Sequence, residues 1–150
     1  MTDKPILEYD VSAERIDAHG SIAICKCAEV RLDTDPAGRA DAFNPAELLL
    51  AALAACMIKG IERVAPKLRF QFDGVQVRIH GKRQDSPPKM VEITYELIVD
   101  TQEPDRRLEL LHENVRKYGT ISNTVAAATT LTGTIRRAKP ASATPVANTA

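Results

Sequence analysis

An uninterrupted apolar run at residues 48–58 is the strongest pattern in this chain. Every position from Leu48 to Ile58 except Cys56 is a large apolar residue or alanine. A surface helix would place polar residues on one face, so this run predicts a helix that is buried nearly all round. At 1.5 Å per residue the run covers about 16 Å, which is too short to cross a bilayer. We therefore expect a core helix.

Signals for the two ends of this helix flank the run. Asn44 can cap the first free N–H groups, Pro45 suits the first helical position, and Glu47 completes the spacing of a capping box. Pro66 predicts an end near residue 64 or 65, because the residue before a proline avoids the helical region. The predicted helix covers about residues 45–65.

The pattern before the central helix predicts a β-hairpin. Residues 6–17 and 22–32 each have the composition of a strand, and turn residues around Gly20 separate them. A polar loop at residues 33–41 leads to the helix. Cys25 and Cys27 fall on one face of the second strand, where they are too few for a zinc site and poorly placed for a mutual disulfide. We expect them to be packing or interface thiols.

The pattern after the central helix predicts a second hairpin, two helical segments and a last strand. A strand with a bulge at Gly74, a loop at residues 81–89 and an alternating strand at residues 90–100 come first. A helix starting near Asp105 has an apolar face with a spacing of three and four residues, formed by Leu108, Leu111, Val115 and Tyr118. Ser122 then caps a short helical turn, and a strand covers residues 130–136. This mixture of elements indicates an α+β fold.

Length and charge exclude several classes of function. A chain of 150 residues suits a single domain, which we place at residues 1–138, and the polar remainder at 139–150 has little to bury and is expected to be a disordered tail. Twenty basic and 20 acidic residues leave no net charge to attract nucleic acid or an anionic membrane. No apolar leader opens the chain, so we expect a cytoplasmic protein whose three cysteines remain thiols.

Cys56 is the candidate nucleophile. Lys59 follows it by three residues and lies on the same side of the helix, where a cation favours the reactive thiolate. The alternative is an inert cysteine in an apolar core. His19, His80 and His112 have no metal-ligand spacing, and we expect neither a metal nor another cofactor.

Two segments resemble the signature regions of the OsmC/Ohr family of osmotically inducible proteins and organic hydroperoxide reductases. The segment NPAELLLAALAAC at 44–56 matches the helix that carries the family's peroxidatic cysteine, and KYGTISNT at 117–124 matches the motif that carries its resolving cysteine. Gly119 stands where that second cysteine would be, and Thr120 stands where a proline is usual. The order of elements is compatible over about residues 6–138.

The resemblance implies an α+β fold with antiparallel sheets around a long buried central helix, in an intertwined homodimer with active sites at the subunit interface. It also implies a glutamate and an arginine beside the cysteine thiolate. Glu47 fits the glutamate, but it lies nine residues from Cys56, about 13 Å along the helix, so a contact requires the partner subunit. A capping role for Glu47 is the alternative. Arg15 is the first candidate for the family's arginine, and Arg39 is the second.

Two functions follow as expectations. The first is thiol-dependent reduction of organic hydroperoxides through Cys56, with an external thiol as reductant because position 119 holds no cysteine. The alternative is a non-catalytic protein of the same fold that binds a small apolar ligand at the dimer interface. Cys56 and Lys59 favour the first, and Gly119 favours the second.

Overall fold

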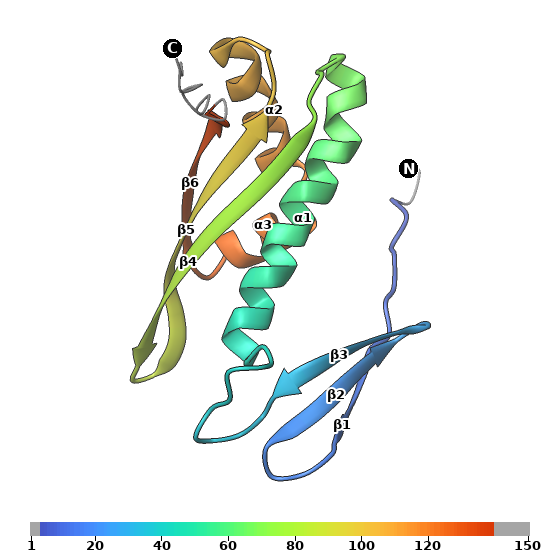
Figure 1. Ribbon diagram of the computed structural model, residues 1–150, viewed down its shortest axis with the longest axis vertical. Coiled ribbons are helices and arrows are strands. Elements are labelled where there is room, and N and C mark those ends of the chain that lie inside the picture. The colour runs from blue at the N-terminus through green and yellow to red at the C-terminus, as the bar shows by residue number, and fades with distance from the viewer. Residues whose placement is uncertain (1–3, 140–150) are drawn as a thin grey trace, which may run out of the picture. The chain divides into compact units, whose positions relative to one another are not determined.

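The computed structural model describes residues 4–139 and divides into two compact units, one up to Leu49 and one from Leu50 (Figure 1). The elements in chain order are β1 (Ser12–Arg15), β2 (Gly20–Cys25), β3 (Ala28–Asp33), α1 (Pro45–Leu68), β4 (Gly74–Asp85), β5 (Pro88–Asp100), α2 (Asp105–Lys117), α3 (Thr120–Ala126) and β6 (Thr130–Arg137). The α+β fold class predicted from the sequence is confirmed. Of the predicted tail, only Lys139 is described, and the rest lies outside the described residues.

The N-terminal unit is a three-stranded antiparallel sheet in the order β1-β2-β3. The predicted single strand at 22–32 is wrong, because Lys26 and Cys27 form a tight turn between β2 and β3. Lys26 has a φ of 56°. A two-residue hairpin turn needs positive φ and usually places glycine, asparagine or aspartate there, so a lysine gave no turn signal.

The first strand is shorter than predicted. β1 covers Ser12–Arg15, and Ser12 already pairs with Ile24 near the end of β2. Residues before Ser12 run past the end of β2 and have no strand partner in the part of the chain that is described. Several exposed apolar side chains lie in this segment and include Ile6, Leu7, Tyr9 and Val11.

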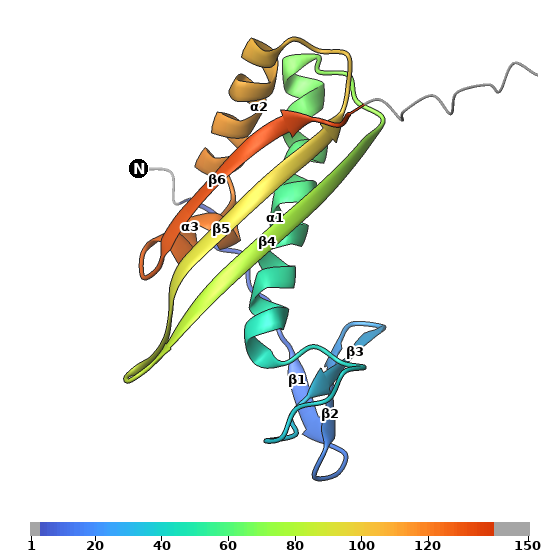
Figure 2. The same cartoon turned by 60° about the vertical axis from the view of Figure 1, so that its left-hand side comes forward.

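The C-terminal unit has a second three-stranded sheet, in the order β4-β5-β6. The strands β4 and β5 are antiparallel, as predicted, whereas β6 runs parallel to β5. The parallel pairing is possible because α2 and α3 carry the chain back between the two strands. Helices α1 and α2 cover the same face of this sheet (Figure 2).

The hairpin of β4 and β5 is longer than predicted. Its strands stay paired as far as Asp85 and Pro88, so most of the expected loop at residues 81–89 is strand. The irregular register lies between Lys82 and Arg83 rather than at Gly74. Phe70, expected in the first strand, instead enters the core from the connection between α1 and β4.

Helix α1 begins as predicted and ends one turn later. Asn44 Oδ1 accepts the Glu47 N–H at 2.9 Å, which confirms the N-terminal cap. The helix continues through Pro66 to Leu68. Its end is stabilised by a hydrogen bond from the Phe70 N–H to the Ala65 carbonyl, 2.9 Å long, and by a left-handed residue, Arg69, with φ 51°.

The hydrophobic core of the C-terminal unit lies between its sheet and helices. Fully buried side chains of the core include Leu53, Met57, Ile61, Ile93, Leu97, Val99, Leu111 and Val115. α1 therefore buries one face, and its opposite face exposes Ala52, Ala55 and, at 38% each, Leu49 and Ile58. Within one chain the expectation of burial all round holds for one side of the helix only.

Helix α2 begins at the predicted Asp105, and Leu108, Leu111 and Val115 are buried as expected. Tyr118, assigned to the same apolar face, is instead 54% exposed. Ser122 does not cap α3, because the N-cap is Gly119 and Ser122 lies inside the helix. β6 agrees with the predicted last strand to within one residue.

Candidate functional site

The candidate nucleophile, Cys56, lies in the middle of α1 as a free, half-buried thiol. Leu53 and Met57 beside it are fully buried, and Ala55 is exposed. The thiol therefore lies at the border between the buried and the exposed face of the helix. Lys59 is exposed one turn further along. At a separation of three residues, the Cβ atoms of Cys56 and Lys59 are about 5–6 Å apart, so the ammonium group can act on the sulfur.

Glu47 lies in the first turn of α1 and is exposed. Its backbone N–H is the donor of the capping bond to Asn44. A carboxylate in this turn also interacts favourably with the positive end of the helix dipole. The capping bond uses only the backbone of Glu47, so the helix dipole is the interaction that favours a glutamate at this position.

Arg15 is the last residue of β1 and lies in the N-terminal unit. It pairs with Ser21 of β2 in the strand register, and it is exposed. Among the described residues its guanidinium forms no ion pair, so it is available for another anionic group.

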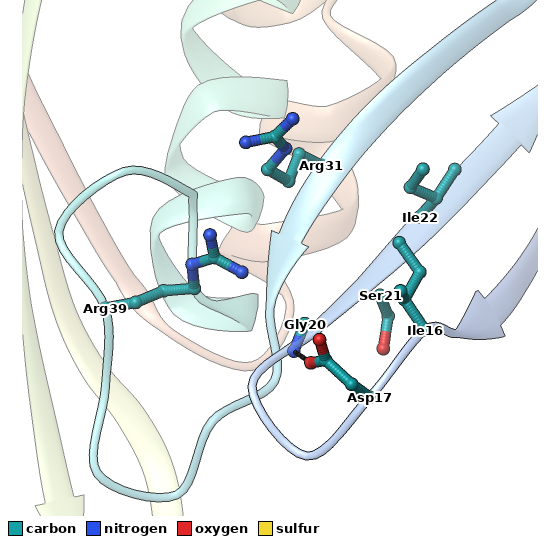
Figure 3. A pocket seen from close by; sticks show the side chains of 7 residues that line it. All are labelled: Ile16, Asp17, Gly20, Ser21, Ile22, Arg31 and Arg39. Atoms are coloured by element: carbon teal, nitrogen blue, oxygen red, sulfur yellow. Dashed lines mark hydrogen bonds between the residues drawn. The ribbon is translucent and has the colours of Figure 1, made fainter.

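Arg39, the second candidate arginine, lies beside the turn of the first hairpin. It lines a pocket of about 210 Å³ together with Ile16, Asp17, Gly20, Ser21, Ile22 and Arg31 (Figure 3). The guanidinium donates to both carboxylate oxygens of Asp41, at 2.5 and 2.7 Å. This hydrogen bonding lowers the pKa of Asp41 and raises that of Arg39. The guanidinium of Arg39 is thus paired with Asp41, whereas that of Arg15 has no carboxylate partner among the described residues.

The backbone of the N-terminal unit holds this pocket in shape. Asp17 Oδ1 accepts the N–H groups of His19 at 2.8 Å and Gly20 at 3.0 Å, which closes the turn predicted from the sequence. The buried Asp33 accepts the N–H groups of Asp35 and Arg39, both at 3.0 Å. Asp33 therefore positions the Arg39 backbone directly, and Asp17 fixes the turn that lines the same pocket.

Gly119 is buried at the junction of α2 and α3. Its φ of −83° is open to any residue, so the backbone conformation does not require a glycine here. The requirement is space. A Cβ at this position would lie 2.9 Å from Ser122 Oγ and 2.9 Å from the Val115 carbonyl oxygen, closer than real Cβ contacts. The second signature segment is thus packed without room for a side chain at position 119.

The other two cysteines are at the β2–β3 turn. Cys25 is the last residue of β2 and pairs with Ala28, and Cys27 is exposed in the turn. The expectation that they share a face of one strand is wrong, because the turn separates them. Within residues 4–139 no group of three or more histidine, cysteine or acidic side chains has a metal-binding arrangement.

The histidines differ from one another in their surroundings. His80 is exposed, and His19 Nδ1 lies 2.6 Å from Asp35 Oδ2. His112 Nε2 is hydrogen-bonded to the hydroxyl of the buried Tyr95, to which Arg116 also donates at 3.0 Å. Burial, followed by the charge of Arg116, lowers the pKa of His112.

Sequence reasoning missed this cluster of Tyr95, His112 and Arg116. The spacing of four residues between His112 and Arg116 places both on one side of α2. Nothing in the pattern indicated which strand residue they meet.

None of the described helices is both long and apolar enough to cross a membrane. No curated protein matches the chain. Solved structures do. An OsmC-like protein from Mycoplasma pneumoniae has a TM-score of 0.81 at 21% identity, over 92% of this chain and 100% of that one.

Two further similar structures are organic hydroperoxide resistance proteins. The one from Legionella pneumophila has a TM-score of 0.67 at 17% identity, over 88% of this chain and 98% of that one. OhrB of Bacillus subtilis has a TM-score of 0.62 at 18% identity, over 87% and 98%. These likenesses establish the fold.

The family follows from the sequence. The profile of the family described as OsmC-like protein matches residues 38–133, which include α1, both signature segments and most of the second sheet. This match covers more than half of the chain. The chain therefore belongs to the OsmC-like protein family.

Proposed function

We propose that this protein reduces organic hydroperoxides through Cys56, using an external thiol as reductant. The observation that carries the proposal is the free thiol at the border of the exposed face of α1, with Lys59 one turn away. Membership of the OsmC-like family supports it. So does the fold shared with two proteins described as organic hydroperoxide resistance proteins.

In the first step the Cys56 thiolate attacks the distal oxygen of the hydroperoxide. A sulfur–oxygen bond forms, the O–O bond breaks, and the alkoxide leaves and takes up a proton to become an alcohol. Cys56 is oxidised to sulfenic acid and the peroxide is reduced. Lys59 favours this step by stabilising the attacking thiolate.

In the second step a small thiol attacks the sulfenic sulfur, giving a mixed disulfide and water. A second thiol molecule then releases Cys56 and forms the disulfide of the reductant. An external reductant is required because Gly119 replaces the second cysteine of the motif, and because the packing around Gly119 leaves no space for one.

We also propose that the active protein is a homodimer in which Glu47 and Arg15 from the partner subunit support the thiolate. The exposed apolar face of α1 supports an association of this kind, because Leu49 and Ile58 cost free energy where water covers them. Arg15 has an unpaired guanidinium in the described part of the chain, whereas Arg39 is occupied by Asp41. This difference favours Arg15 of the two arginines.

The competing function is a non-catalytic protein that binds a small apolar ligand at the same interface. The packing at Gly119 favours it, since a chain that has filled the place of a resolving cysteine has lost part of the two-cysteine cycle. The two functions differ in one property, which is the reactivity of Cys56.

Mass spectrometry of Cys56 after stoichiometric cumene hydroperoxide separates them. The peroxidase function requires a mass increase of one oxygen at Cys56, trapping of that species by dimedone, and its reversal by a small thiol. Replacement of Cys25 and Cys27 by serine is the matched control, and the double variant should react within a few-fold of the parent. If Cys56 does not react with millimolar hydroperoxide at pH 8 while the fold is intact, the peroxidase function is wrong and the binding function is favoured.

A further inference from the structure

A cleft between α1 and α2 in the C-terminal unit is not used by the proposed reaction. It has a volume of about 310 Å³ and is lined by Arg63, Val64, Lys67, Leu68, Asn114 and Tyr118. A water molecule takes about 30 Å³ of liquid volume, so the cleft has room for a ligand of about ten non-hydrogen atoms. Such a volume is at the lower limit of clefts that bind small molecules.

The charges in this cleft are all positive. Arg63 and Lys67 are four residues apart on α1, and neither forms an ion pair with a carboxylate in residues 4–139. Lys117 does not line the cleft, but its Nζ lies 5.3 Å from the ring centroid of Tyr118, which does. Like charges four residues apart destabilise a helix, so an anion bound between them would stabilise it.

Arg63 is held in place from α2. One of its terminal nitrogens donates to the Tyr118 carbonyl oxygen at 2.9 Å. A guanidinium has five donors in a fixed plane, so the groups not used by Tyr118 are oriented for a carboxylate. The Asn114 amide instead donates to the Leu110 carbonyl at 2.8 Å. The two cations, rather than the amide, are therefore the groups that recognise a ligand.

The remaining wall of the cleft is apolar. Val64 is buried, Leu68 is half-buried, and Tyr118 leaves the apolar face of α2 to stand 54% exposed beside the cations. The sequence pattern places Tyr118 in the core, but it follows the last residue of α2, where the backbone leaves the helical path and frees the ring to line the cleft. An exposed aromatic ring with a cationic neighbour suits a ligand with one apolar and one charged end.

We propose that this cleft binds a small carboxylate with an apolar chain, the carboxylate on Arg63 and Lys67 and the chain along Val64, Leu68 and Tyr118. Binding does not involve the thiol, so a Cys56→Ser variant retains it. Octanoate, with about ten non-hydrogen atoms, matches the volume of the cleft.

Isothermal titration calorimetry with octanoate tests the proposal on the full chain. We expect saturable binding with a dissociation constant of about 0.1–1 mM, in keeping with the modest affinity of small ligands. Octanol, which lacks the charge, should bind at least about five-fold more weakly, and inorganic phosphate, which lacks the chain, should do the same. In a ¹H–¹⁵N spectrum, octanoate should shift the amides of Asn114 and Tyr118.

The variant Lys67→Met keeps the apolar stem and removes the charge, and it should weaken octanoate binding about five-fold or more. Lys89→Met is the control, because Lys89 is exposed at the start of β5, outside the cleft. Arg63→Met is a second test, with circular dichroism to confirm that loss of the Tyr118 contact leaves the fold intact. Equal binding of octanol and octanoate, equal affinity of the two lysine variants, or no binding below about 10 mM overturns the proposal. If phosphate binds as tightly as octanoate, the cleft binds anions without regard to an apolar chain, and the proposed role of Val64, Leu68 and Tyr118 is wrong.

Discussion

Gly119 and Ser122 are so close that a Cβ added at position 119 would lie 2.9 Å from Ser122 Oγ. The same Cβ would lie 2.9 Å from the Val115 carbonyl oxygen, which belongs to the backbone of α2 and cannot turn away. In the second signature motif this is the place of the resolving cysteine. The packing of α2 against α3 therefore has no space for a cysteine side chain at position 119.

Gly119→Ala should destabilise the protein by about 1–3 kcal/mol, the usual cost of overfilling a packed site. Gly74→Ala is the control, because a Cβ there would lie at an ordinary contact distance of 3.9 Å from Asp100 Cβ. Urea unfolding of both variants measures the difference. Equal stability of the two would mean that α2 and α3 separate easily at position 119, and a cysteine introduced there could then act as a resolving thiol.

Ser122 is 1% exposed, and its buried hydroxyl has no hydrogen-bond partner among the described residues. Ser122→Ala should therefore be neutral or stabilising, by up to about 1 kcal/mol, because it removes an unsatisfied buried group. Thr101→Val is the matched comparison. The Thr101 hydroxyl, on a residue 3% exposed, donates to the Gln71 carbonyl and accepts the Glu103 N–H. Its loss should cost about 1–3 kcal/mol in the same urea experiment.

His112 should make folding stability depend on pH. Burial and the charge of Arg116 lower its pKa below 6.5, so the folded protein favours the neutral imidazole and the unfolded chain binds the proton more readily. The neutral group's contribution is fully present above pH 6.5 and is lost as the pH falls below that value toward the folded-state pKa. Glu113 opposes this shift.

His112→Gln keeps a hydrogen-bonding side chain next to Tyr95 and removes the titration. Its unfolding free energy should decline less than that of the parent between pH 7 and pH 5. His80→Gln is the control, because His80 is exposed on β4. A parent and a His112→Gln variant with the same pH profile would place the pH dependence in other groups.

The sequence predicts those elements whose own side chains determine them. The apolar run at 48–58, the cap at Asn44 and the apolar spacing in α2 each identify a helix from neighbours along the chain, and the structure places α1 and α2 there. The strands β5 and β6 likewise follow from alternation. Local pattern and tertiary packing agree at these positions, so local reasoning suffices.

The predictions that are wrong have physical causes that cannot be read from the pattern of apolar and polar residues. Lys26 adopts a positive φ that is usual for glycine. Because a lysine gives no turn signal, the sequence pattern predicts one strand where the structure has β2 and β3. Pro66 is accepted inside α1 because the following residues still close the last turn. Tyr118 fits the apolar spacing of α2 but lies beyond its last residue, where the backbone has left the helical path.

The exposed face of α1 leads to a prediction about assembly. Light scattering after size exclusion should give about twice the chain mass of 16.4 kDa. Ala52→Glu places a charge on the exposed apolar side of α1 and should shift the protein toward the monomer, because a buried unpaired charge is costly. Gln76→Glu, on an exposed position of β4, is the control. A parent protein that is monomeric at micromolar concentration contradicts a dimer built on α1.

The last prediction concerns Lys59. It rests on the proposed peroxidase function. Lys59 is exposed one turn from Cys56 on α1, and in the proposed reaction its ammonium group stabilises negative charge on the attacking sulfur. Lys59→Met keeps the apolar stem and removes the charge. Since an exposed charge pair is worth about 0.2–1 kcal/mol, oxidation of Cys56 by cumene hydroperoxide at pH 7 should slow about two- to five-fold.

The dependence on pH and salt separates this electrostatic effect from a change in packing. Raising the pH should narrow the difference between parent and variant, because the thiolate then forms without help from a cation. High salt should narrow it as well, since it screens an exposed charge. Lys89→Met, far along the chain on β5, should oxidise at the parent rate. A Lys59→Met variant that reacts as fast as the parent at every pH would leave Lys59 without a role at Cys56, and a variant that is slow at every pH and salt concentration would assign the effect to packing.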